Sequence, residues 1–134
     1  MAITYTRNQI TKPQNVLGQL KTVTAKTSDY TVTAAESGTI FTTEGAGGAV
    51  IFTTPAVGDG LHYWFVNAEN QDMTVTAGSA DTMVTFNDVA ADSVGFSTSS
   101  EKVGGAIFIV SDGTKWMTFL HTYDGADQAV TVAT

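Results

Sequence analysis

Residues 106–120 read AIFIVSDGTKWMTFL, two apolar runs on either side of Asp112-Gly113. Asp-Gly suits the positive φ angles of a type I′ turn, so this stretch predicts a β-hairpin. The same kind of sequence extends through the chain, because Thr alternates with Val in runs such as residues 22–24, 31–33 and 74–76. β-branched residues at this density favour extended backbone. The sequence therefore predicts an all-β protein.

Short strands separated by turn residues are expected from about residue 20 to the end. No stretch shows the 3.6-residue apolar period of an α-helix. Many short strands at close spacing are typical of an antiparallel β-sandwich or a jelly-roll-like barrel, and this is the fold that we expect. The expected strands are 20–26, 30–34, 39–43, 49–54, 61–67, 72–77, 82–86, 92–98, 105–111, 115–122 and 128–133.

The composition points to a soluble protein that is held together by burial and association. The chain has 134 residues, of which 14% are charged and none is cysteine, so disulfides and cysteine-based metal sites are excluded. No apolar run approaches the ~18 residues of a membrane span, and the N-terminus lacks a signal-peptide pattern. We expect synthesis in the cytoplasm and no membrane partner.

The sequence divides into a basic arm and an acidic body. Residues 1–19 are rich in Asn, Gln and Thr and contain Pro13 and Gly18, so we expect an extended arm that orders only against a partner. Residues 20–134 are expected to form the β-sandwich domain. Four cations and no acid precede Asp29, whereas residues 29–134 hold all 13 acids against two lysines. The arm could dock on an acidic neighbour, although four scattered cations are also compatible with ordinary solvated residues.

The strand at residues 61–66, LHYWFV, does not alternate between apolar and polar residues. Leu61, Tyr63 and Phe65 would share one face, and His62, Trp64 and Val66 the other. Two interpretations remain open. The strand is central and buried between layers, or His62, Trp64 and Val66 lie at an oligomer interface, where aromatic residues are enriched.

Motifs for catalysis or cofactor binding are not found, and we expect no enzyme activity, no cofactor and no metal. His62 and His121 lie among apolar neighbours and are expected to be packing residues. Gly45-Ala46-Gly47-Gly48 lacks the Lys-Ser/Thr and the helix of a phosphate loop. The loop 67–72 could wrap a cation but lacks EF-hand spacing. The acidic body opposes nucleic-acid binding.

Two segments carry a resemblance to a known class of protein. Residues 34–55, AAESGTIFTTEGAGGAVIFTTP, and residues 60–66, GLHYWFV, resemble a β-rich module of tailed-bacteriophage virion proteins. In that module an acidic-Ser-Gly turn, a Gly-Ala-rich hairpin, a Pro-containing loop and an aromatic strand follow in this order. Residues 110–116 are similar to its final hairpin. The resemblance covers about residues 29–122 and brings no catalytic residues with it.

The resemblance implies a structural role on a virion. A chain of one module with a short arm is most similar to a capsid decoration, or cement, protein, which implies a homotrimer on the outer capsid that binds the major capsid protein. In that case Tyr5, Arg7, Ile10 and Lys12 of the arm are the expected capsid contacts. The alternative is a tail-fibre or receptor-binding head, in which Trp64, Trp116, Tyr63 and Tyr123 stack on sugar rings.

Overall fold

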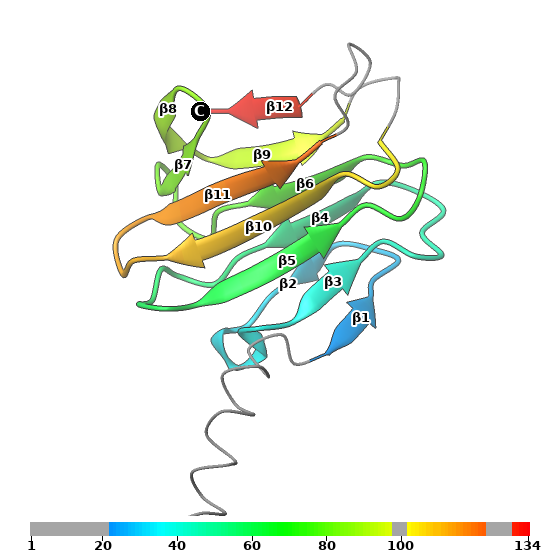
Figure 1. Cartoon of the computed structure of the whole chain (residues 1–134), viewed down its shortest axis with the longest axis horizontal. Coiled ribbons are helices and arrows are strands. Elements are labelled where there is room, and N and C mark those ends of the chain that lie inside the picture. The colour runs from blue at the N-terminus through cyan, green and yellow to red at the C-terminus, as the bar shows by residue number, and fades with distance from the viewer. Residues whose placement is uncertain (1–21, 98–101, 123–129) are drawn as a thin grey trace, which may run out of the picture.

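The computed structural model describes residues 22–97, 102–122 and 130–134, and within them the chain forms two facing β-sheets (Figure 1). The seven-stranded sheet has the order β1-β3-β5-β10-β11-β7-β8, and the five-stranded sheet has the order β12-β9-β6-β4-β2. The strands are β1 Val23–Ala25, β2 Tyr30–Thr31, β3 Ile40–Thr42, β4 Val50–Thr53, β5 His62–Val66, β6 Met73–Thr76, β7 Met83–Thr85, β8 Asp88–Ala91, β9 Ser93–Phe96, β10 Ala106–Ser111, β11 Trp116–His121 and β12 Val130–Ala133, with one 3-10 helix, η1, at Ala34–Glu36.

The predicted all-β sandwich is confirmed, but the expected antiparallel pairing is wrong for half of the strand pairs. The chain alternates between the two sheets from β1 to β6, and each strand from β3 to β6 runs parallel to the strand two strands before it. In this way β1, β3 and β5 are parallel neighbours in one sheet, and β2, β4 and β6 are parallel neighbours in the other. The sheets are therefore mixed, and antiparallel strands such as β9 and β10 complete them.

The hairpin at residues 106–120 is confirmed, with β10 and β11 paired from Ala106–His121 to Ser111–Trp116. Its turn is not type I′, because Gly113 has a φ of 95° while Asp112 and Thr114 do not have positive φ. The Asp112 side chain instead accepts hydrogen bonds from the backbone N–H groups of Thr114 and Lys115, both at 2.8 Å. These backbone hydrogen bonds lower the pKa of Asp112.

Aromatic side chains fill the space between the sheets. Phe41 of β3 and Phe65 of β5 stack with ring centroids 5.7 Å apart, and Phe52 of the opposite sheet lies 4.9 Å from Phe65. All three are fully buried. The core also contains Val32, Val50, Tyr63, Met73, Val75, Met83, Ala91, Val94, Phe96, Ile107, Ile109 and Trp116.

A group of polar contacts surrounds η1. The Glu36 carboxylate accepts hydrogen bonds from the Tyr30 hydroxyl at 2.6 Å and from the Thr33 N–H at 2.9 Å. Partial burial alone would raise the pKa of Glu36, but these hydrogen bonds and the charge of Lys26 lower it. The Tyr63 hydroxyl donates to the Thr33 carbonyl at 2.9 Å. Burial, helped by the Glu36 charge, raises the pKa of Tyr63 to about 12.

Truncation of the core aromatic Phe65→Ala is expected to lower the free energy of unfolding by about 3–5 kcal/mol, because it leaves a cavity between the sheets. The control is Val103→Ala, whose side chain is 58% exposed and whose loss should cost less than about 1 kcal/mol. Urea titration followed by tryptophan fluorescence measures both. Equal losses in the two variants would contradict this assignment of the core.

Glu36→Gln is expected to lower stability at neutral pH. A carboxylate whose pKa is lowered by folding stabilises the protein above its unfolded pKa, and this contribution is lost as the pH falls through the folded pKa. The denaturation midpoints of the wild type and the variant should therefore differ at pH 7 and converge below about pH 4. Glu44→Gln, at an exposed position, is the control. A gap of the same size at pH 7 and at about pH 3 would refute the assignment.

Candidate functional site

The three predicted interface residues of β5 lie together on the outer face of the seven-stranded sheet. Along β5, Tyr63 and Phe65 are fully buried in the core, whereas His62, Trp64 and Val66 are half-buried on the other side. The strand is central, between β3 and β10. The structure thus supports a central position for β5, but only its inner face is enclosed between the two sheets.

Trp64 belongs to an apolar row that crosses five strands in register. Val23 of β1 pairs with Ile40 of β3, and Ile40 pairs with Trp64. Trp64 pairs with Phe108 of β10, which pairs with Phe119 of β11. Ring centroids lie 5.0 Å apart for Trp64 and Phe108 and 5.9 Å apart for Phe108 and Phe119. We call Val23, Ile40, Trp64, Phe108 and Phe119 the aromatic row.

The outer face around the aromatic row is uncharged. The positions that share its side of the strands are Ala25, Thr42, His62, Val66, Ala106, Val110, Met117 and His121. None of these is Asp, Glu, Lys or Arg, although the sequence has 13 acidic residues. The His62 ring lies 6.4 Å from the Phe108 ring in an edge arrangement, and its Nδ1 is 2.9 Å from the Gly60 carbonyl. Polar contacts thus hold His62 at the margin of the aromatic row.

The outer face of the five-stranded sheet is mostly polar, although Ile51 of β4 is 40% exposed there. Thr31, Thr53, Thr76 and Ser93 form a row in register across β2, β4, β6 and β9, with Thr74 beside it. These hydroxyl-bearing side chains present a polar surface that water can solvate. An apolar row is therefore a property of one sheet and not of the whole surface, and this contrast makes the outer face of the seven-stranded sheet the candidate site.

Sequence reasoning missed Phe119, the most exposed ring of the row. Its position in the strand was predicted, and the alternation of residues 116–121 indicates which residues share a side. That Phe119 extends a row from Trp64 follows only from the pairing of β5, β10 and β11, which the sequence does not contain.

Two of the four aromatic residues of the predicted sugar-binding alternative are not accessible. Trp116 and Tyr63 are fully buried, with ring centroids 6.0 Å apart, so neither can stack on a glycan. Trp64 is half-buried in the aromatic row. Tyr123 lies outside the described residues.

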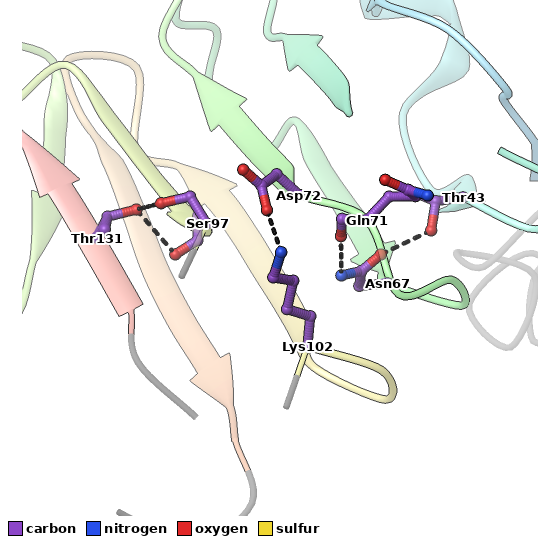
Figure 2. A network of polar contacts seen from close by, with 8 residues as sticks. Thr43, Asn67, Gln71, Asp72, Ser97, Lys102 and Thr131 are labelled. Carbon is purple, nitrogen blue, oxygen red and sulfur yellow. Dashed lines mark hydrogen bonds and ion pairs between the residues drawn. The ribbon is translucent and has the colours of Figure 1, made fainter. Parts of the chain in front are cut away.

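The loop at residues 67–72, which the sequence offered as a cation loop, uses its polar groups within the protein (Figure 2). Asn67 is fully buried. Its amide oxygen accepts from the Thr43 hydroxyl at 2.7 Å, and its amide nitrogen donates to the Gln71 carbonyl at 2.9 Å. Asp72 forms an ion pair with Lys102. The loop thus serves to join β3, β5 and the start of β10.

Residues 22–97, 102–122 and 130–134 contain no group of three or more His, Cys, Asp or Glu side chains placed to hold a metal ion. They also contain no helix that is long and apolar enough to cross a membrane.

The predicted arm contacts Tyr5, Arg7, Ile10 and Lys12 lie outside the described residues. The first described residues lead directly into β1, whose Val23 is 68% exposed at the end of the aromatic row. Shortly after β1, the Lys26 ammonium lies 3.4 Å from the centroid of the Tyr30 ring, a cation–π contact. The sequence before residue 22 is thus connected to the edge strand of the candidate site.

No protein-family model and no curated protein sequence matches this chain.

Asn67→Ala is expected to lower the free energy of unfolding by about 1–3 kcal/mol, because it leaves the Gln71 carbonyl and the Thr43 hydroxyl without their buried partner. Asn70→Ala is the matched control in the same loop, since Asn70 is exposed. Chemical denaturation measures the difference. A loss no larger than that of the control would show that the Asn67 contacts do not hold the loop.

Proposed function

We propose that this protein is a structural virion protein that binds the outer surface of a phage head as a homotrimer and stabilises it, as a capsid decoration protein does. The observation that carries the proposal is the uncharged aromatic row on an otherwise Thr-rich and acidic body. The resemblance of residues 34–55 and 60–66 to a phage virion module is the reason for proposing a phage head as the assembly to which the protein binds. Its site of action would be the capsid surface, after synthesis in the host cytoplasm.

Self-association is supported by the composition of the outer face. Residues at the core of protein interfaces are depleted in charge and enriched in aromatic side chains, and this face has both properties. Copies of a body with a strong net negative charge repel one another over about a Debye length, ~8 Å at physiological salt. They come together at the lowest electrostatic cost where no charged side chain must be desolvated.

Attachment to the major capsid protein is assigned to the arm at residues 1–19. Arg7 and Lys12 supply the positive charge of the arm, whereas the body is negatively charged. The arm would therefore be attracted to an acidic surface on a different protein. In a trimer, three arms bind at once, and their combined affinity exceeds that of a single arm because the second and third contacts are intramolecular. This arrangement needs no catalytic residue, cofactor or nucleic acid.

The alternative, a tail-fibre or glycan-binding head, receives less support. Two of the four aromatic residues that it requires, Tyr63 and Trp116, are buried in the core. A glycan needs hydrogen-bond partners for its hydroxyl groups, and the outer face around Trp64 offers few beyond Thr42 and the two histidines.

Deletion of residues 2–15 is expected to leave a folded oligomer that no longer binds capsids. Co-sedimentation with assembled phage heads that lack the protein measures the binding, and circular dichroism checks the fold. Wild-type protein should saturate with a copy number that is a multiple of three and should bind more weakly at high salt.

The control is Arg7→Lys together with Lys12→Arg, which keeps the charge of the arm and should keep the binding. Undiminished capsid binding by the deletion variant would reject the role of the arm. Binding on a glycan array without binding to capsids would favour the alternative function.

A further inference from the structure

The turn of the β7–β8 hairpin holds an exposed aromatic residue in a conformation that aromatic residues rarely adopt. Thr85 pairs with Asp88, so Phe86 and Asn87 form a two-residue turn. Phe86 has a φ of 44° and is 68% exposed. A turn of this kind with positive φ at its first central position normally carries Gly there, and a bulky residue with positive φ is an outlier. Folding alone would therefore favour glycine at this position.

The fold does not use the Phe86 ring. Phe86 belongs neither to the buried core nor to the apolar side chains packed against the core. Backbone strain that persists without a packing reason is characteristic of functional sites, where the surrounding structure holds the strained residue in place. The strain at Phe86 thus points to a role for its ring outside the folded chain.

The surrounding structure does hold the hairpin in place. Figure 1 shows β7 and β8 at the edge of the molecule, close to the C-terminal strand β12. On one side the Lys115 ammonium donates to the backbone carbonyls of Asp81 and Val89, the latter at 3.0 Å. On the other side the Thr134 hydroxyl donates to the Asp88 carboxylate at 3.0 Å. The ring is therefore presented on an ordered base, which reduces the entropy that is lost on binding.

The hairpin that carries the ring is acidic. Asp88 lies two residues after Phe86, and Asp81 and Asp92 are joined at the base of the hairpin, where the Asp92 carboxylate accepts the Asp81 N–H at 2.7 Å. The neighbouring cation is Lys115, whose ammonium is already bound by two backbone carbonyls. The hairpin thus combines one exposed apolar ring with an excess of negative charge.

We propose that the tip of the β7–β8 hairpin is a second attachment point of this protein, and that Phe86 inserts into an apolar pocket of the major capsid protein whose rim carries Lys or Arg side chains. The proposal deepens the proposed function and rests on it. The arm requires an acidic surface and the hairpin a basic rim, so the two contacts use different parts of the same partner. Their affinities combine because the second contact is intramolecular.

The charges of the chain favour this partner over a second copy of the body. Residues 22–134 contain three cations, Lys26, Lys102 and Lys115. The Lys26 ammonium lies 3.4 Å from the centroid of the Tyr30 ring, Lys102 forms an ion pair with Asp72, and Lys115 is bound by carbonyls. A second body therefore brings engaged cations together with all 13 acids. A different protein with free cations attracts the hairpin instead.

The shape of the contact follows from the exposure of a single ring. An aromatic side chain contributes most to binding when it fills a pocket from which water is excluded and when the contacts around it keep water out. One ring on a two-residue turn can be enclosed in this way only by a concave site. The partner surface is therefore expected to be a pocket and not a flat face.

The test uses full-length Phe86→Gly, with Val103→Ala as the control for removal of an exposed apolar side chain. Val103 is 58% exposed and lies in the turn before β10, outside the hairpin. Co-sedimentation with assembled phage heads that lack the protein gives the affinity. Phe86→Gly should bind at least about tenfold more weakly than the wild type, and Val103→Ala should bind as the wild type does. Equal binding by Phe86→Gly and the wild type would overturn the proposal.

A stability measurement separates binding from folding. Glycine adopts positive φ at no steric cost, so the thermal midpoint of Phe86→Gly should equal or exceed that of the wild type while its binding to heads falls. A lowered midpoint would show that the ring serves the fold and would overturn the proposal. Light scattering on the same sample should show unchanged self-association. Weaker self-association with unchanged binding to heads would make a second copy, through its basic arm, the occupant.

Asp88→Asn tests the charge of the partner. The amide oxygen of Asn can still accept the Ala90 N–H, which the carboxylate accepts at 2.8 Å, but the charge is lost. Binding to heads should weaken and should depend less on salt than that of the wild type. Glu44→Gln, at an exposed position outside the hairpin, is the control. Stronger binding by Asp88→Asn would contradict a basic rim.

The two proposals fail in different ways. Heads that bind the wild type and Phe86→Gly equally well uphold the proposed function and reject the hairpin contact. Heads that bind neither protein, at concentrations where the wild type is folded, reject the proposed function and the capsid pocket with it.

Discussion

The contact of Phe52 with Phe65 and Phe41 across the two sheets is the interaction on which the rest of the structure depends. Phe52 belongs to the five-stranded sheet, and the other two belong to the seven-stranded sheet. Their ring centroids lie 4.9 Å and 5.7 Å from that of Phe52, so one cluster joins both layers. Because side chains alternate along a strand, burial of these rings decides which residues of β3, β4 and β5 point outward. The composition of both outer faces follows from this choice.

The two outer faces then differ because different residues alternate with the core positions. On β6, Thr74 and Thr76 flank buried Val75, and the outer face is polar. On β5, Trp64 lies between buried Tyr63 and Phe65, and the outer face is apolar. A strand that is apolar on both sides leaves apolar side chains exposed to water unless its second side is also covered, and contiguous exposed apolar surface is typical of interaction sites. The aromatic row is therefore the surface that the proposed self-association would cover.

The strand positions were predictable because turn residues and β-branched runs are local signals. Strand β8 was missed, since Asp88-Val-Ala-Ala carries neither a strong apolar pattern nor a Thr-rich one. The pairing was predicted wrongly because parallel and antiparallel strands share the same two-residue alternation of side chains. In addition, no local sequence signal indicates that the chain crosses to the other sheet and back between β1 and β3. The type I′ turn was a local inference that failed because Asp112 caps the turn with its side chain instead.

For the candidate site, the sequence by itself determined that His62, Trp64 and Val66 share one side of a strand, since side-chain alternation depends only on extended backbone. It also determined the hairpin of β10 and β11 and the absence of charge along both strands. Only the tertiary structure decided that Trp116 is buried in the core while Phe119 is exposed, and that Val23, Ile40, Trp64, Phe108 and Phe119 form one row. The reason is that a row across a sheet depends on strand order and register, which are set by contacts between residues far apart in the chain.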